Sequence, residues 1–320
     1  MRVLFMGSGA FALPSLDALL DSSHDVLALV TQPDKPAGRG HEVRMPRTKA
    51  LALERGLAVH QPSRVRAEAA IETVRGIAPE IIVVVAYGQI IPTAILDLPK
   101  HGTVNVHASL LPRYRGAAPI QWAIARGETE TGVTTMLMDA ALDTGPILLQ
   151  REVAIGEADT GGTLEAKLAP LGAELLLETL SKWGRGEIVP VPQNDGAATL
   201  APRIKKEEAL VEWGRTATEI HQRVRAFDPW PVAFLPLPGG AALRIWKTRV
   251  SAPPASSGDP PGRILRVERD SLVVACGGQT ALLVDEVQPA GKERMTASAF
   301  ARGRRLGPGD VLGVPPPESM

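Results

Sequence analysis

Three polar residues stand where they could act together on one carbonyl carbon. Asn105 and His107 are separated by one residue in an apolar stretch, and Asp143 follows the next such stretch along the chain. An amide is a neutral hydrogen-bond donor, an imidazole changes charge near neutral pH, and a carboxylate can accept a proton or orient the imidazole. This set of side chains suits the transfer of an acyl group to an amine without a covalent intermediate.

The spacing of Asn105 and His107 is also compatible with a structural role. An Asn that caps a strand beside a hydrogen-bonded His produces the same Asn-x-His pattern, so the pattern alone leaves both interpretations open. Asp139 lies close to Asp143 in the chain, and its place at the end of a strand favours a structural role.

A glycine-rich turn near the N-terminus suggests a different chemistry. Residues 7–12 read Gly-Ser-Gly-Ala-Phe-Ala and fit the G-x-G-x-x-A fingerprint of dinucleotide-binding proteins, with Asp34 roughly where a ribose-binding acid is expected. Asp34, however, follows a proline and opens a basic loop instead of ending a strand. A tight glycine turn is also what any strand-to-helix junction requires, so a nicotinamide-dependent dehydrogenase stays the weaker alternative.

The elements around these residues alternate between short apolar strands and helices. This alternation predicts that the first 190 or so residues form an open, doubly wound, Rossmann-like α/β sheet. We expect strands at 3–6, 25–31, 57–60, 81–86, 103–107 and 131–138, helices at 11–20, 48–55, 67–76 and 119–126, and a long loop at 32–48. Asn105 and His107 then share one face at the carboxyl end of their strand, where open α/β sheets bind ligands.

The pattern changes after a segment rich in Gly, Pro and Asn at 184–202, which we interpret as a linker. A helix at 216–225 and five short strands at 232–237, 242–247, 263–268, 272–276 and 281–286 predict a small C-terminal β-barrel of the OB type. We expect Trp230, between two prolines, to be a packing corner. The predicted domains are therefore 1–189 and 206–320, joined by a linker at 190–205.

Composition and charge exclude several classes of protein. The 35 basic residues equal the 35 acidic ones, so an electrostatic partner site must be local. The single cysteine, Cys276, cannot form an internal disulfide or a Cys-based zinc site. The longest apolar run is far shorter than the roughly 20 residues of a membrane helix, so we expect a cytoplasmic protein.

Several motifs together resemble the methionyl-tRNA formyltransferases, a branch of the folate-dependent formyltransferase family. The similarity spans nearly the whole chain and rests on Val85-Ala86-Tyr87-Gly88, Asn105 to Pro112 (NVHASLLP), Arg115 to Gln121 (RGAAPIQ), Met138-Asp139, Leu142-Asp143-Thr144-Gly145, Lys206-Glu207-Glu208-Ala209, Pro229-Trp230-Pro231 and Gln288 to Lys292 (QPAGK). The chain departs from the family at Gly7-Ser8-Gly9-Ala10, where Gly-Thr-Pro and a polar residue are expected.

The resemblance implies a function and a set of site residues. It implies an N-terminal catalytic domain that binds 10-formyltetrahydrofolate as the formyl donor, with no metal, and a C-terminal barrel that helps to bind initiator tRNA. By matching position, Asn105, His107 and Asp143 become the catalytic trio, and the folate-binding loop comprises Ser109, Leu110, Leu111 and Pro112.

The acceptor is indicated by basic residues outside this core. Five cations against two carboxylates give the loop at 32–49 a local charge of +3, which matches a segment that orders on RNA. The tRNA contacts that we predict are Lys35, Arg39, Arg44, Lys206 and Lys292. A formyltransferase acting on a sugar-nucleotide amine would keep the same trio and stays an alternative, and we expect a monomer.

Overall fold

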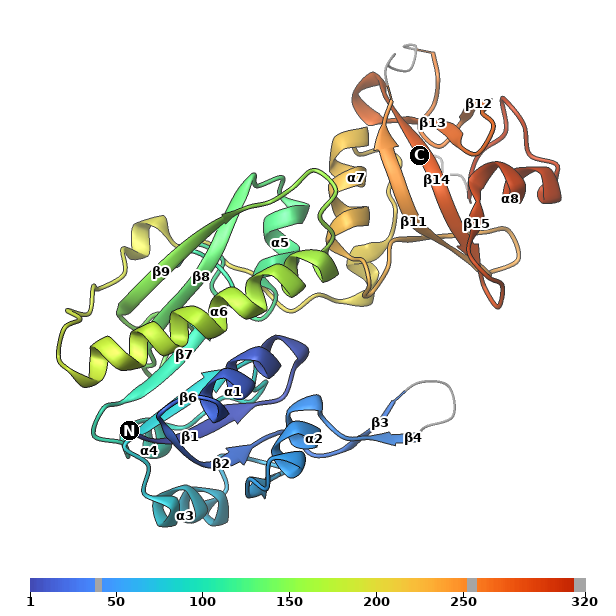
Figure 1. The fold of residues 1–320 in the computed structure, drawn as a ribbon. Helices are drawn as coiled ribbons and strands as arrows, with labels where there is room; N and C mark the ends of the chain where they lie inside the picture. Colours follow the sequence, from blue (N-terminus) through green and yellow to red (C-terminus); the bar gives the residue numbers. More distant parts are fainter. Residues whose placement is uncertain (38–41, 252–257, 314–320) are drawn as a thin grey trace. The chain divides into compact units, whose positions relative to one another are not determined.

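A computed structural model describes residues 1–37, 42–251 and 258–313, and the chain divides into two units (Figure 1). The first unit comprises Met1–Pro119, Glu130–Ala154 and Leu164–Pro202, and the second comprises Ile120–Thr129, Ile155–Thr163 and Arg203–Met320. The domain and linker boundaries given above stay predictions.

The first unit is built on a seven-stranded sheet with the order β5-β2-β1-β6-β7-β8-β9. Its strands are β1 (Arg2–Gly7), β2 (Asp25–Val30), β5 (Val59–His60), β6 (Ile81–Val85), β7 (Thr103–His107), β8 (Glu130–Leu137) and β9 (Ile147–Ala154). The strands from β5 to β7 pair in parallel, whereas β8 and β9 are antiparallel to their neighbours. The predicted Rossmann-like fold class is confirmed, with a mixed instead of a uniformly parallel sheet.

Helices cover both faces of this sheet. The helices of the amino-terminal two thirds are α1 (Leu13–Leu20), α2 (Arg47–Glu54), α3 (Glu68–Ile77), α4 (Thr93–Leu96), α5 (Pro119–Ala125) and α6 (Gly161–Gly184). On one face α6 approaches β7 and β8 closely, because a Cβ at Gly172 would lie 3.1 Å from Val106, and Thr179 bonds Thr135 at 2.8 Å. On the other face α3 and α4 pack their apolar residues against β1 and β6. Among the residues that the structure describes, we find no helix both long and apolar enough to cross a membrane.

The segment at 32–48 contains regular structure where we predicted a loop. Two short strands, β3 (Lys35–Ala37) and β4 (Glu42–Arg44), pair antiparallel and project beside α2 as a hairpin (Figure 1). The charged and glycine-rich sequence of this segment lacks the apolar alternation that marks a strand, so the sequence pattern did not reveal the pairing.

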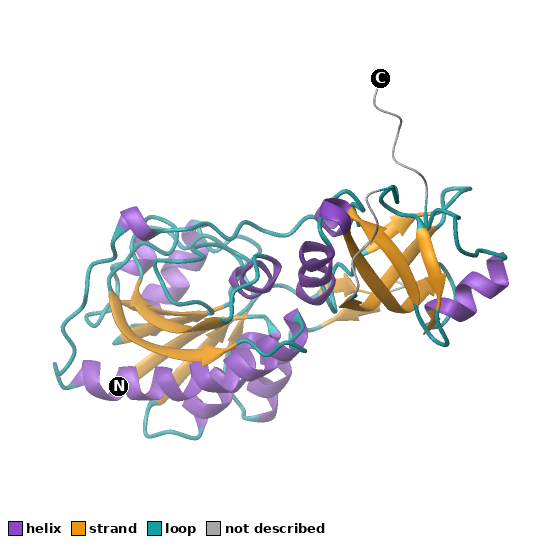
Figure 2. Cartoon of the chain, turned by 90° about the horizontal axis from the view of Figure 1, so that it is seen from above, coloured by secondary structure: helices purple, strands orange, loops and turns teal. Residues whose placement is uncertain are grey.

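The second unit contains an antiparallel sheet with the order β10-β11-β14-β13-β12, and β15 pairs with β14 (Figure 2). Its elements are α7 (Ala217–Ala226), β10 (Phe234–Pro236), β11 (Ala242–Val250), β12 (Ile264–Val267), β13 (Leu272–Cys276), β14 (Thr280–Pro289), β15 (Met295–Thr296) and α8 (Ala297–Arg304). Ile220 and Val224 of α7 share one core with Leu243, Ile245 and Phe300. The expected packing role of Trp230 is wrong, because this residue is 58% exposed.

Candidate functional site

Asn105 and His107 lie on one face of β7, as the alternation predicted. In the antiparallel pairing with β8, Asn105 stands opposite Met136 and His107 opposite Thr134, so all four side chains share that face. Asn105 is 8% exposed and His107 is 6% exposed. The sheet therefore holds an amide and an imidazole side by side in a largely desolvated position.

Asp143 reaches this face from a turn that folds back over the sheet. The turn leaves β8 near the start of β7, where the Met138 amide donates to the Thr103 carbonyl at 2.8 Å. It then returns, so that Oδ2 of Asp143 lies 3.7 Å from Nδ1 of His107. The same oxygen accepts a 2.8 Å hydrogen bond from the amide of Gly116. The fold thus brings a buried carboxylate to the imidazole from a separate part of the chain.

The second ring nitrogen of His107 is held by the main chain. Its Nε2 lies 2.9 Å from the carbonyl oxygen of Tyr114. Because a carbonyl can only accept, Nε2 must carry a hydrogen, and Nδ1 is the nitrogen that can gain or lose a proton beside Asp143.

The loop that follows β7 is fixed by hydrogen bonds to the neighbouring strands. The buried Ser109 hydroxyl donates to the Arg113 carbonyl at 2.7 Å. Thr134 donates to the Ser109 carbonyl at 2.6 Å and accepts from the Leu111 amide at 3.1 Å, and Gln150 donates to the Leu111 carbonyl at 2.9 Å. The loop containing Ser109 to Pro112 is therefore rigid, and the Ser109 hydroxyl supports its backbone.

The turn around Asp143 depends on its neighbours for its shape. Asp139 accepts hydrogen bonds from the Thr144 hydroxyl at 2.7 Å and the Ala141 amide at 3.1 Å, in line with the structural role expected for it. A Cβ at Gly145 would lie 1.8 Å from the Leu137 carbonyl oxygen, so this position has room only for glycine.

Comparison with known protein families identifies the family of this chain. The formyl transferase family model matches residues 1–180, and the model of the formyl transferase C-terminal domain matches residues 203–305. The chain belongs to the formyl transferase family. The buried residues Asn105, His107 and Asp143 all lie within the part of the chain that the formyl transferase model matches.

Related sequences of this formyltransferase match it along almost its full length. The methionyl-tRNA formyltransferase of Pelobacter propionicus is 50% identical over 311 residues, which cover 97% of this chain and 96% of that protein. The methionyl-tRNA formyltransferase of Geobacillus thermodenitrificans is 47% identical over 314 residues, covering 98% of each.

Solved structures with low sequence identity share the fold. An N-formyltransferase from Helicobacter canadensis, in complex with folinic acid and dTDP-3-aminofucose, has a TM-score of 0.63 at 18% identity, covering 89% of this chain and 99% of that one. HypX from Aquifex aeolicus in complex with tetrahydrofolic acid has a TM-score of 0.61 at 19% identity over 100% of this chain. This chain spans 50% of the HypX chain, and both likenesses concern the fold alone.

The glycine turn and Asp34 of the formyltransferase have other partners than a dinucleotide. The Ser8 hydroxyl lies 3.0 Å from that of Thr31 and accepts from the Gln32 amide at 2.8 Å. Asp34 pairs with Lys49 at 2.6 Å and accepts from Gln61 at 2.7 Å. The hydrogen bonds from Lys49 and Gln61 lower the pKa of Asp34. These contacts hold the base of the β3–β4 hairpin, so the turn and the acid have structural roles that do not require a ribose.

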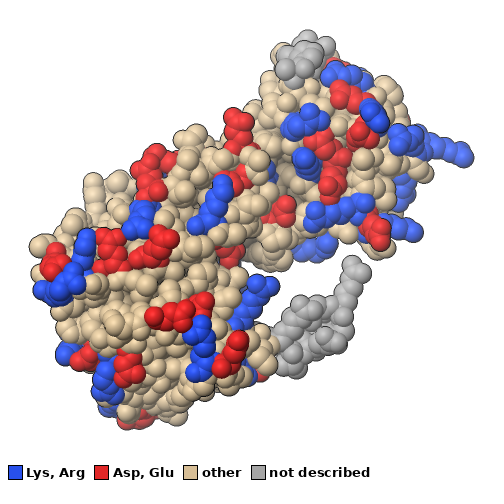
Figure 3. Space-filling view, in the orientation of Figure 1, with Lys and Arg blue, Asp and Glu red and all other residues tan. Residues whose placement is uncertain are grey.

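The predicted tRNA contacts lie at several places. The backbones of Lys35 and Arg44 pair across the hairpin, and Arg39 lies outside the described residues. In the second unit, Lys292 is exposed, and Nζ of exposed Lys206 lies 6.0 Å from the centre of the Phe234 ring. On the face seen in Figure 3, basic and acidic side chains are interspersed. The assignment of these five residues to tRNA stays a prediction.

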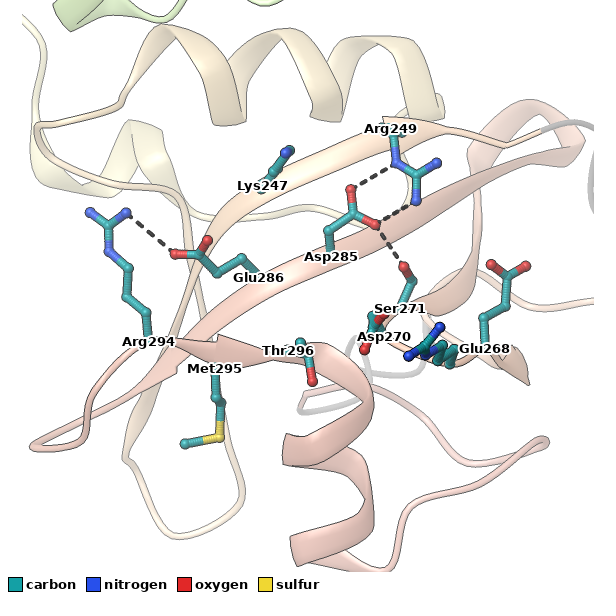
Figure 4. Close-up of a pocket in the computed structure, with 11 residues that line it drawn as sticks. Lys247, Arg249, Glu268, Asp270, Ser271, Asp285, Glu286, Arg294, Met295 and Thr296 are labelled. Carbon is teal, nitrogen blue, oxygen red and sulfur yellow. Dashed lines mark hydrogen bonds and ion pairs between the residues drawn. The ribbon is translucent and has the colours of Figure 1, made fainter.

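An open groove of about 740 Å³ in the second unit contains paired charges (Figure 4). Arg249 bonds both carboxylate oxygens of Asp285, and Arg294 pairs with Glu286 at 3.3 Å. The Arg294 guanidinium also lies 3.4 Å from the centre of the Trp246 ring. Because carboxylates accompany these arginines, the groove does not form a concentrated binding site for an anion.

Sequence reasoning missed the residues that support the trio from the segment at 191–201. Arg115 is 7% exposed and bonds Gln193, while the Tyr114 amide donates to the Thr199 hydroxyl at 2.8 Å. Val191 pairs with Ile147 at the start of β9. A Pro- and Asn-rich segment resembles a linker in sequence, and only its tertiary contacts show that it packs against Tyr114, Arg115 and the start of β9.

Proposed function

We propose that this formyltransferase transfers the formyl group of 10-formyltetrahydrofolate to the free amino group of methionyl-initiator tRNA, giving N-formylmethionyl-tRNA for translation initiation. Relatives with that activity in their names match at up to 50% identity over both domains. The observation that carries the chemistry is the buried pair of His107 and Asp143, 3.7 Å apart, with Asn105 on the same sheet face.

The first step forms a bond between the methionyl nitrogen and the formyl carbon. The amine attacks in its neutral form, and the formyl oxygen becomes an oxyanion in a tetrahedral intermediate. The amide of Asn105 donates a hydrogen bond to that oxyanion, and His107 becomes positively charged beside it once it has accepted the amine proton. Burial strengthens both interactions because little water competes for them.

The second step breaks the bond between the formyl carbon and N10 of the folate. The attacking nitrogen loses a proton, and N10 gains one, so the net proton count is unchanged. Nδ1 of His107 is the nitrogen that faces Asp143, and this pair accepts the amine proton and returns it, directly or through water, to N10. Asp143 stabilises the imidazolium that exists between these two transfers.

The formyl donor fits the rigid loop beside the trio. Leu110 and Pro112 are only partly buried, and their loop begins two residues after His107. These side chains give the planar pteridine an apolar contact surface, while Ser109 and Leu111 hold the backbone behind it. We assign residues 109–112 to the folate on this basis.

The tRNA requires contacts beyond the reacting amine. We assign its phosphates to Lys35, Arg39 and Arg44 of the hairpin segment and to Lys206 and Lys292 of the second unit, because phosphate recognition depends on Lys and Arg. One monomer then acts on one tRNA, and the reaction takes place in the cytoplasm, where charged tRNA serves translation.

Single-turnover formylation tests this function. Enzyme in excess over methionyl-initiator tRNA, with 10-formyltetrahydrofolate, should convert the bound methionine to formylmethionine, detected by mass spectrometry after deacylation. Methionyl-elongator tRNA and an amino-sugar nucleotide serve as competing acceptors. Formylation of the amino sugar with none of the charged tRNA would overturn the proposal in favour of a sugar formyltransferase.

A further inference from the structure

Gln193 contributes a side chain to the trio although it lies far from it in sequence. Its Nε2 donates to the Asp143 carbonyl at 2.9 Å and to the Gly145 carbonyl at 2.7 Å. An amide group has two hydrogens, so each carbonyl receives one of them. Gln193 therefore binds the backbone of the Asp143 turn on both sides of Thr144.

The turn needs such support because its backbone is strained. Asp143 has a φ of +54°, in the left-handed region that residues with a side chain rarely occupy. This conformation directs the carboxylate toward His107 and the Gly116 amide. Hydrogen bonds to the flanking carbonyls favour this conformation over the more common ones.

Arg115 fixes the orientation of the Gln193 amide. Its Nε and one terminal nitrogen donate to Oε1 of Gln193 at 3.0 and 2.9 Å, and it also pairs with Asp195 at 2.7 Å. A guanidinium only donates, so the amide oxygen must face Arg115 and the amide nitrogen must face the turn. The backbone of Arg115 is held in turn by the carbonyl of Thr199 at 2.8 Å and the amide of Ala201 at 2.7 Å.

We propose that Gln193 is a positioning residue that sets the placement of the Asp143 carboxylate against His107, with Arg115 aligning its amide. This inference rests on the proposed function, since the same trio is involved. The position of the Asp143 carboxylate is therefore fixed by two contacts. Gln193 bonds the main chain of Asp143, and the Gly116 amide bonds its side chain.

Two substitutions at Gln193 test this role in the full-length enzyme. Gln193→Met keeps the length of the side chain and removes both donors, whereas Gln193→Glu keeps an acceptor for Arg115 and turns an oxygen toward the two carbonyls. We expect the single-turnover rate at saturating substrates to fall by about 10² for each, as for a catalytic group displaced by an ångström. The KM values for folate and tRNA should stay within about twofold, because the Gln193 amide is engaged by the Asp143 turn and by Arg115. Gln279→Met, the same change at an exposed glutamine of the second unit, is the matched control.

A double-mutant cycle separates positioning from general stability. In an Asp143→Asn background, Gln193→Met should cost less than about threefold, because the carboxylate through which it acts is already gone. The positioning role would be overturned if Gln193→Met lowered the rate equally in both backgrounds, if the variants changed only KM, or if they kept the wild-type rate. If Gln193→Glu does not fold, Gln193→Met alone provides the test. If the wild type formylates methionyl-tRNA and the Gln193 variants are equally active, this inference is refuted and the proposed function stands. If the wild type itself does not formylate methionyl-tRNA, the proposed function is refuted together with this inference.

Discussion

The carbonyl oxygen of Tyr114 lies 2.9 Å from Nε2 of His107, so the main chain fixes one side of the imidazole while its other nitrogen faces Asp143. The Tyr114 backbone is itself held by the Thr199 hydroxyl. The ring plane is therefore set before either substrate arrives. A preorganised imidazole of this kind needs no reorientation during the reaction, which lowers the cost of reaching the transition state.

His107→Ala should lower kcat by about 10² to 10⁴, the range for loss of a general acid or base. Binding of tetrahydrofolate should change little, because the imidazole acts on charge that develops during the reaction. Single-turnover formylation and a fluorescence titration with tetrahydrofolate measure the two effects separately. His60→Ala, on the edge strand β5, is the control and should keep normal activity; a wild-type rate in His107→Ala would refute the assignment.

Asn105→Ala should lower kcat by about 10² to 10³ through loss of an oxyanion donor. Since the oxyanion forms only after attack, the KM values for both substrates should move far less than kcat. Steady-state kinetics with each substrate varied in turn check this. A change confined to KM would instead make Asn105 a ground-state binding residue.

Asp143→Asn and Asp139→Asn form a matched pair for the carboxylate. Asn at 143 keeps an oxygen for the Gly116 amide but loses the charge beside His107, so turnover should fall by at least about 10² at every pH tested. Asn at 139 keeps an acceptor for Thr144 and Ala141, and its activity should stay within about threefold of wild type. A pH–rate profile of both variants decides, and the reverse order of effects would transfer the catalytic role to Asp139.

The parts of the fold that depend on local sequence pattern could be predicted. Continuous apolar runs gave the buried strands β1 and β6, and the period of two in β7 put Asn105 and His107 on one face. The direction of β8 and β9 was not predictable in the same way, because strand polarity depends on how the chain returns to the sheet, and the connections at 108–129 and 138–146 carry no local signal of it.

The supporting residues of the site were not predictable because their contacts are tertiary. Asp143 could be named as a candidate from its type, but its approach to His107 depends on a turn that folds back across the sheet. Gln193 and Thr199 stand in a segment whose Pro and Asn content indicates a linker, and extended chain of this kind shows no periodicity that reveals its partner. Arg115 was visible only as part of a family motif.

Asp34→Asn should destabilise the base of the hairpin in a pH-dependent way. The hydrogen bonds from Lys49 and Gln61 lower the pKa of Asp34 in the folded state, so the ion pair contributes stability above the ordinary pKa of an aspartate. That contribution disappears as pH falls through the lowered value. Urea unfolding should show a stability gap between wild type and variant at pH 7 that narrows toward pH 3.

Lys49→Met is the partner control for this ion pair. Its stability gap should follow the same pH dependence, and the double variant should cost less than the sum of the two single changes, because both remove one interaction. A gap that is constant from pH 7 to pH 3 would contradict the ion pair as its source.

The last prediction concerns the hairpin and tests tRNA as the acceptor. Replacing Lys35, Arg39 and Arg44 together with Ala should weaken binding of methionyl-tRNA and flatten its dependence on salt. Each phosphate contact contributes up to about 0.9 to the slope of log K against log salt for duplex nucleic acid, so three contacts predict a change of about two to three units. Tetrahydrofolate affinity should stay unchanged, since the loop proposed to bind folate lies after β7.

The charge-matched control replaces Arg55, Arg75 and Lys100, which pair with carboxylates on the same unit, and should leave the slope near that of wild type. Binding titrations at several salt concentrations provide both slopes. Equal slopes for the hairpin variant and wild type would remove the hairpin from the tRNA interface and return weight to a small amine as the acceptor.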